Sequence, residues 1–124
     1  MDIKQYLLES EKTNSHLFNP DERAKNLLHG SIGISTEAGE LLDHMKKHIY
    51  QDRDLDVVNI KEELGDIMWY MAIILRALNL DFEEILDLNI QKLRKRYGEE
   101  FDEQKALLRD LDEERKILEG KETK

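Results

Sequence analysis

The chain has 124 residues, of which 28 are acidic and 19 basic, so its formal net charge at pH 7 is −9. It has no cysteine, which excludes disulfides and thiolate metal sites, and its acidic balance argues against binding to nucleic acid or to anionic membranes. The longest uncharged apolar run, Ile67 to Leu75, is well short of the roughly 18 residues of a membrane-spanning helix, and the first residues lack the apolar stretch of a signal peptide. We therefore expect a soluble, cytoplasmic protein.

Apolar residues recur at a spacing of three to four, and no segment alternates like a strand, so the sequence predicts an all-α fold, an antiparallel helical bundle. Helices are predicted from Asp2 to about Lys12, from about Pro20 to about Tyr50, from about Val57 to Leu78, from Asp81 to near Tyr97, and within the charged segment 99–124. The boundaries rest on the end signals Asn19 with Pro20, Asn79, Asp81 and Gly98. Residues 1–98 are expected to form one domain, and residues 99–124 a surface helix that belongs to it or frays.

Each of the first three predicted helices carries an apolar stripe when residues are projected at about 100° per position. In the first helix the inward residues are Ile3, Leu7 and Leu8. In the second they are Ile34, Ala38, Leu41, Leu42, Met45 and Ile49. In the third they are Ile60, Leu64, Ile67, Met68, Met71, Leu75 and Leu78. We expect these stripes to face the core.

Two matched pairs of acidic residues lie beside these stripes. Glu37 and Glu40 stand three apart in the second helix, and Glu63 and Asp66 stand three apart in the third, with 22 residues between the pairs. Residues three apart share a helix face, so antiparallel packing brings four carboxylates to one groove. Neighbouring anions repel and need a cation, and oxygen ligands favour Mg²⁺ or Mn²⁺. The alternative is that these acids are only the solvated edge of amphipathic helices.

Gly30 and Gly33 lie on the carboxylate face, one and two turns before the first acidic pair. A glycine inside a helix costs of the order of 1 kcal/mol relative to alanine, so these two need a reason. We expect the missing side chains to leave room for a bulky group, and we assign both residues to substrate binding. Gly39 and Gly65 point away from the acids, where close approach of another helix or subunit explains them better.

Two short strings contain the acidic pairs: residues 34–41 read ISTEAGEL, and residues 62–67 read EELGDI. The fourth predicted helix adds Asn89, Lys92, Arg96 and Tyr97. With this content, the region from about Leu27 to Tyr97 resembles the all-α nucleoside triphosphate pyrophosphohydrolases of the MazG type. That superfamily also includes dimeric dUTPases and dCTP pyrophosphatases.

The resemblance implies Mg²⁺-dependent hydrolysis of a nucleoside or deoxynucleoside triphosphate between the α- and β-phosphates, with Mn²⁺ as a substitute ion. It implies a homodimer or a dimer of dimers. The catalytic and metal-binding residues that it implies are Glu37, Glu40, Glu63 and Asp66. Its implied substrate-binding residues are Asn89, Lys92, Arg96 and Tyr97. The number of metal ions stays open, because Thr36 stands where relatives usually carry a further acid. The proton of the attacking water goes to Glu37 or Glu40, and the sequence does not choose between them.

Several of these positions have two interpretations. Tyr70 projects in line with Glu63 and Asp66, so it either touches the sugar or base of a substrate or packs at a subunit contact. His44 follows Glu40 by one turn and is either a partner of the acids or an exposed polar residue. The pair Lys92 and Arg96 holds the triphosphate or simply complements the C-terminus of its helix.

Other functions fit the sequence less well. A non-catalytic helical interaction module, with the charged C-terminal helix as its partner-binding arm, predicts no tight divalent-ion site. A di-iron bundle needs Glu-x-x-His pairs, and none of the four histidines has Glu three positions before it. A helix-turn-helix DNA binder needs a basic recognition helix, and the basic cluster from Lys92 to Arg96 lies on the face assigned to phosphate.

Overall fold

The protein is described here by a computed structural model of residues 1–14 and 22–122. All regular structure in these residues is helical, which confirms the all-α prediction. The described helices are α1 (Ile3–Glu11), α2 (Arg23–Tyr50), α3 (Val57–Leu78), α4 (Phe82–Tyr97), α5 (Glu103–Leu107) and α6 (Leu111–Leu118). The chain divides into two compact units, residues 1–80 and residues 81–124. None of the described helices has both the length and the apolarity that crossing a membrane requires.

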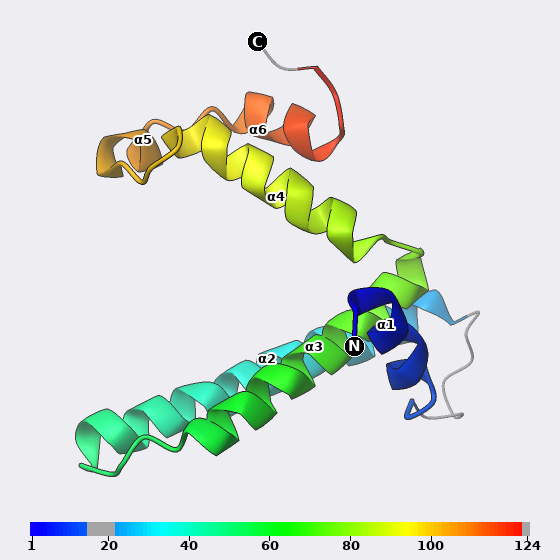
Figure 1. Ribbon diagram of the computed structural model, residues 1–124, viewed down its shortest axis with the longest axis vertical. Coiled ribbons are helices and arrows are strands. Elements are labelled where there is room, and N and C mark those ends of the chain that lie inside the picture. Colours follow the sequence, from blue (N-terminus) through cyan, green and yellow to red (C-terminus); the bar gives the residue numbers. More distant parts are fainter. Residues whose placement is uncertain (15–21, 123–124) are drawn as a thin grey trace. The chain divides into compact units, whose positions relative to one another are not determined.

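The first unit is built around α2 and α3, which lie side by side as an antiparallel hairpin (Figure 1). The sequence predicted the end of α2 at Tyr50 and both ends of α3, and the structure confirms them. Asn79 closes α3 in the left-handed conformation, with φ of 50°. The predicted cap at residues 19–20 lies outside the described residues, and α2 begins at Arg23.

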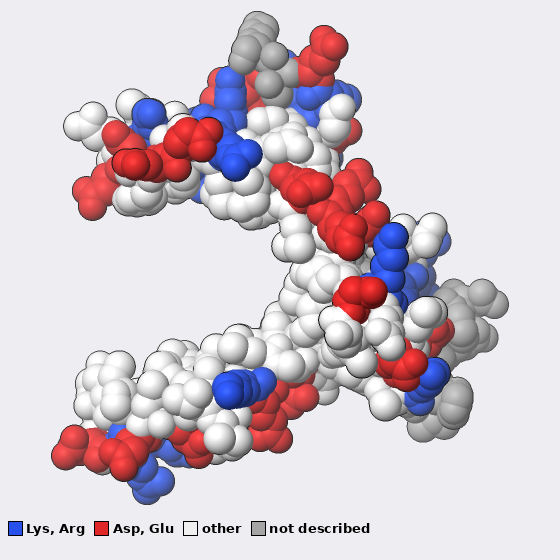
Figure 2. All heavy atoms as spheres, in the orientation of Figure 1, with Lys and Arg blue, Asp and Glu red and all other residues white. Residues whose placement is uncertain are grey.

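The apolar stripes are buried only where the helices of this unit touch. The buried apolar residues of α3 are Ala72, Ile73 and Leu75. Several residues that were predicted to face inward are instead exposed, namely Leu8, Leu42, Ile49, Leu64 and Leu78. Their predicted burial is wrong within a single chain, because a two-helix layer covers only one strip of each helix. Residues other than Lys, Arg, Asp and Glu form much of the visible surface of α2 and α3 in Figure 2.

Helix α1 is tied to α3 by polar contacts from two α3 side chains. Arg76 donates through Nη1 to the backbone oxygen of Leu7 at 2.9 Å and to Oγ of Ser10 at 2.8 Å. Trp69 donates through Nε1 to Oγ1 of Thr13 at 2.7 Å. These contacts place the N-terminal helix against the C-terminal half of α3.

Gly30 and Gly33 are buried where α2 packs against α3. A Cβ atom at Gly30 would lie 2.6 Å from Cγ1 of Ile74, and one at Gly33 would overlap the ring of Tyr70. The Tyr70 ring also meets Trp69 edge-on, with centroids 5.1 Å apart. The bulky groups beside these glycines are therefore Tyr70 and Ile74. The expectation that the glycines leave open space for substrate is wrong, and Tyr70 packs inside its own unit.

We expect Gly33→Ala to lower the free energy of unfolding by about 1 to 3 kcal/mol, because the added methyl group must displace the Tyr70 ring. Gly39→Ala is the matched control, since a Cβ atom there meets nothing within 4 Å. Replacing an unhindered helical glycine with alanine stabilises a protein by roughly 0.5 to 1 kcal/mol. Urea titrations of both variants measure the two shifts, and shifts of the same sign would contradict this packing.

The second unit contains α4, α5 and α6. Asp81 caps α4 by accepting a hydrogen bond from the Glu83 backbone, and α4 ends before Gly98, as predicted. The single helix expected over residues 99–124 is wrong, because that segment forms two short helices. Asp102 and Asp110 each accept backbone N–H groups of the residues that follow them, which starts a new helix at each aspartate.

Helix α6 packs against α4 and is not a purely exposed helix. Its buried residues are Glu113, Glu114 and Ile117. Because these contacts join α4 to the C-terminal segment, the division between the units follows Leu80, whereas the sequence suggested a boundary at residue 98.

Candidate metal centre

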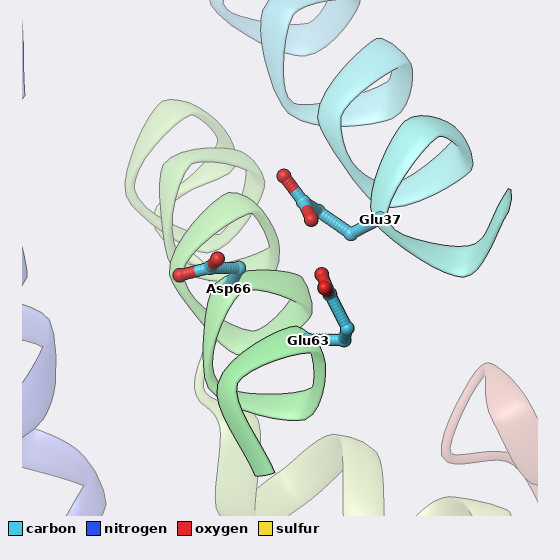
Figure 3. Close-up of side chains that lie close together, drawn as sticks. All are labelled: Glu37, Glu63 and Asp66. Atoms are coloured by element: carbon cyan, nitrogen blue, oxygen red, sulfur yellow. The ribbon is translucent and has the colours of Figure 1, made fainter. Parts of the chain in front are cut away.

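Three of the four predicted carboxylates converge between α2 and α3. Glu37 extends from α2 toward Glu63 and Asp66 on α3 (Figure 3). One carboxylate oxygen from each of the three residues lies within 4.8 Å of the other two. The antiparallel hairpin therefore brings acids from both predicted pairs to one place, as their spacing on the two helices indicated.

Glu63 is the buried member of this cluster, with 7% of its side chain exposed. Its Oε1 lies 3.4 Å from Nε2 of His44, whereas its Oε2 is buried and has no hydrogen-bond partner among the described residues. Of the two interpretations of His44, the structure supports a partner of the acids. A buried carboxylate oxygen without a donor is costly unless a cation or another donor satisfies it.

The acids of α2 hold their protons more tightly than isolated glutamates. The pKa of Glu37 is raised to about 7, first by a side-chain hydrogen bond with Glu63 and then by burial and by neighbouring negative charges. Glu40 is exposed and stands outside the group of three, but its pKa is also raised, chiefly by the charge of Glu63. Negative charges held close together thus cause most of the Glu40 shift and part of the Glu37 shift, and a bound cation would relieve them.

The donor set fits a hard divalent cation. It consists of carboxylate oxygens from Glu37, Glu63 and Asp66, and one buried oxygen in it lacks a partner among the described residues. Mg²⁺ and Mn²⁺ prefer such oxygen ligands, and Mg²⁺ in proteins is commonly held by a few carboxylates together with phosphate groups of a substrate.

Comparison with known proteins identifies the family to which the chain belongs. The model of the MazG nucleotide pyrophosphohydrolase domain matches residues 31–101. The chain belongs to this family. It is also similar to the gene 37 protein of Mycobacterium phage L5, with 31% identity over an alignment of 77 residues that covers 58% of this chain and 67% of the phage protein. No solved structure matches the chain.

The MazG domain includes both acidic pairs and the whole of α4, so it spans parts of both units. The four acids lie in the first unit. The residues expected to bind the nucleotide from α4 lie in the second, namely Asn89, Lys92, Arg96 and Tyr97. Residues 102–124 lie beyond the matched region.

Arg96 is engaged inside the second unit. It donates to both carboxylate oxygens of Glu114, through Nε at 2.8 Å and through Nη2 at 3.1 Å, and its side chain is 12% exposed. Arg109 donates to the same carboxylate through Nη2 at 2.8 Å. Because two guanidinium groups stabilise its anion, the pKa of Glu114 is lowered to about 2. The sequence did not reveal this pairing, because Glu114 lies in a segment that was expected to be one exposed helix.

The other α4 residues differ in accessibility. Asn89 is exposed and Lys92 is half-buried. Tyr97 packs against Phe101 with ring centroids 4.9 Å apart, and its hydroxyl oxygen accepts a hydrogen bond from Arg96 at 3.4 Å. Asn89 and Lys92 are therefore better placed than Tyr97 to meet a molecule in solution.

Sequence patterns missed one residue beside the acids of the MazG domain, Tyr6 of α1. Its hydroxyl donates to the backbone oxygen of Gly65 at 3.5 Å. Burial and the nearby charge of Asp66 raise the pKa of this phenol. No local pattern relates Tyr6 to residues near position 65, so only the packing of α1 on α3 reveals the contact.

We expect the metal-free protein to lose stability as the pH rises through about 7, because Glu37 binds its proton more tightly in the folded state, with a pKa of about 7 against an ordinary value of 4.5. The stabilising effect is complete below the unfolded pKa and is lost as the folded group ionises. Urea midpoints measured from pH 5 to pH 8 without divalent ions test this. Glu37→Gln removes the titrating group, so its urea midpoint should fall less between pH 5 and pH 8 than that of the unaltered protein. Equal falls in the two proteins would contradict the raised pKa of Glu37.

Proposed function

We propose that the protein is a cytoplasmic Mg²⁺-dependent nucleoside triphosphate pyrophosphohydrolase. In this reaction, one water and one nucleoside or deoxynucleoside triphosphate give the monophosphate and pyrophosphate. The observation that carries the proposal is the convergence of Glu37, Glu63 and Asp66 within 4.8 Å in a MazG domain, with a buried Glu63 oxygen that has no partner among the described residues.

We assign two roles to the carboxylates of this chain: they bind the divalent ion, and one of them accepts a proton from water. Glu37, Glu63 and Asp66 would hold the ion, with Glu40 beside them at the exposed edge. Bound Mg²⁺ would neutralise the triphosphate charge and lower the pKa of a water molecule. Glu37 and Glu40 are the two candidates for accepting the proton of the attacking water, since both lie on α2 next to the other acids.

We propose that cations of α4 bind the triphosphate. Lys92 and Arg96 stand four apart and share a helix face, and Asn89 lies one turn before Lys92. Two cations facing the β- and γ-phosphates would stabilise the departing pyrophosphate. The ion pair of Arg96 with Glu114 gives this arginine a second role, because it fixes α6 to α4. Lys92 forms no ion pair among the described residues and is therefore the clearer test of phosphate binding.

We expect Lys92→Ala to lower kcat/KM by about 10² to 10³, because it removes a cation from a developing anion. Lys95→Ala is the control, since around the helix Lys95 lies about 60° from Lys92 and about 100° from Arg96, outside the arc between those two residues. It should cost little in activity. Arg96→Ala is also expected to lower the urea midpoint, because it leaves buried Glu114 with one partner fewer. Similar rates of pyrophosphate release by the Lys92 and Lys95 variants would contradict the phosphate role.

We propose further that the active protein is a homodimer or a dimer of dimers. The supporting observation is the amount of apolar surface that the first unit leaves exposed, including Leu42 at 69% and Ile49 at 67%. Large apolar side chains exposed in such numbers are typical of a protein interface. Sedimentation or light scattering measures the mass; a monomer at micromolar concentration would contradict this part of the proposal.

A panel of nucleoside and deoxynucleoside triphosphates, incubated with the protein and Mg²⁺, tests the proposed function. Release of pyrophosphate and a monophosphate from at least one nucleotide is expected. A non-catalytic interaction module would instead leave every nucleotide intact, and its melting temperature would not respond to Mg²⁺ or Mn²⁺.

A further inference from the structure

The two oxygens of the Glu63 carboxylate lie in different surroundings. Oε1 is 3.4 Å from Nε2 of His44. Oε2 is buried and has no hydrogen-bond partner among the described residues. The other neighbours of Glu63 on α2 are the acids Glu37 and Glu40, which hydrogen-bond with Glu63 through their own protons and bring no positive charge. His44 is thus the described basic side chain that faces this carboxylate.

The position of His44 follows from the geometry of the helix hairpin. It lies one turn after Glu40 on α2, so it projects on the same face toward α3. Its side chain is 20% exposed and that of Glu63 is 7% exposed, so the contact is sheltered from water. A sheltered hydrogen bond to an anion is stronger and more restrictive than one in solvent.

The chemistry assigns the direction of this contact. An ionised carboxylate can only accept, so Nε2 of His44 carries the proton and donates to Oε1. That bond occupies one oxygen and limits rotation of the carboxyl group. The other oxygen keeps its lone pairs for a cation.

We propose that His44 is a positioning residue of the metal centre: it holds Oε1 of Glu63 so that Oε2 binds the ion. This inference rests on the proposed function, since it concerns the same cation. It adds a residue that touches neither the ion nor the nucleotide and acts through Glu63. Donors behind a ligand typically change metal affinity by about 10- to 100-fold when they are removed.

Two amide substitutions at position 44 distinguish a donor at Nε2 from bulk alone. His44→Gln carries its amide nitrogen at about the reach of Nε2, whereas the shorter side chain of His44→Asn reaches only the level of Nδ1. We expect His44→Asn to raise the Kd for Mn²⁺ by about 10- to 100-fold, and His44→Gln to bind more tightly than His44→Asn. Calorimetric titration of each folded variant with Mn²⁺ at pH 8 measures this, and circular dichroism verifies the fold.

His48→Asn is the matched control, because His48 lies one turn further along α2 and contacts the backbone oxygen of Arg53 at 2.7 Å, away from the acids. Its Kd for Mn²⁺ should equal that of the unaltered protein. The inference is overturned if His44→Asn binds Mn²⁺ as tightly as the unaltered protein, or if His44→Gln is as weak as His44→Asn. Failure of the unaltered protein to bind Mn²⁺ at all would instead overturn the proposed metal centre itself.

Discussion

Glu63→Gln is expected to lower turnover of the best nucleotide by about 10² to 10³ or more while leaving the helices intact. The change keeps the size of the side chain and removes its negative charge. Because Glu63 is the buried acid between α2 and α3, loss of its charge weakens the hold on a cation. The amide also relieves the repulsion by Glu40 and Glu37, and it keeps an oxygen that accepts from His44. Steady-state kinetics and the Mg²⁺-induced shift in melting temperature measure the two effects.

Glu62→Gln is the matched control for this variant. It makes the same chemical change one residue earlier, at an exposed position of α3. Normal turnover and a normal Mg²⁺ response are expected from it. Comparable losses of activity in both variants would mean that the overall charge of α3, and not the position of Glu63, governs the reaction.

Ile73→Ala is expected to lower the free energy of unfolding by about 2 to 5 kcal/mol. Ile73 is 2% exposed and is the largest side chain that is fully buried in the described residues. Truncation removes its transfer free energy and leaves a cavity that neighbouring side chains fill only partly. Urea unfolding followed by circular dichroism measures the loss.

Leu64→Ala provides the comparison for Ile73→Ala. The sequence pattern placed Leu64 on the buried stripe of α3, yet its side chain is 52% exposed in the single chain. Its truncation should therefore change stability by no more than about 0.5 kcal/mol in a monomer. A larger loss that grows with protein concentration would show that a second copy covers Leu64.

The sequence predicted the helices well because their ends carry local chemical signals. Helix ends are marked by a capping side chain, as at Asp81, or by a residue at positive φ, as at Asn79 and Gly98. Such signals act over only a few residues. Asp102 and Asp110 give the same kind of signal. The expectation of one C-terminal helix overlooked them, because apolar spacing alone was followed through that segment.

The candidate site was predicted where it depends on periodicity and missed where it depends on packing. Three-residue spacing identified the acids of α2 and α3. It did not separate Glu63, which is buried, from Glu40, which is exposed. The difference in burial depends on how close each side chain lies to the line of contact between α2 and α3. Two further contacts depend on packing in the same way: Tyr70 fills the space beside Gly33, and Arg96 pairs with Glu114. No periodic pattern in the sequence links the residues of either pair.

Hydrolysis in ¹⁸O-labelled water most directly tests the central claim that this MazG protein cleaves between the α- and β-phosphates. The protein is incubated with Mg²⁺ and the best nucleotide of the panel. The products are then separated, and their masses are measured by mass spectrometry. The account predicts pyrophosphate without label and a monophosphate that carries one ¹⁸O, because water attacks the α-phosphorus. Label in pyrophosphate, release of orthophosphate with a nucleoside diphosphate, or no turnover of any nucleotide would contradict it.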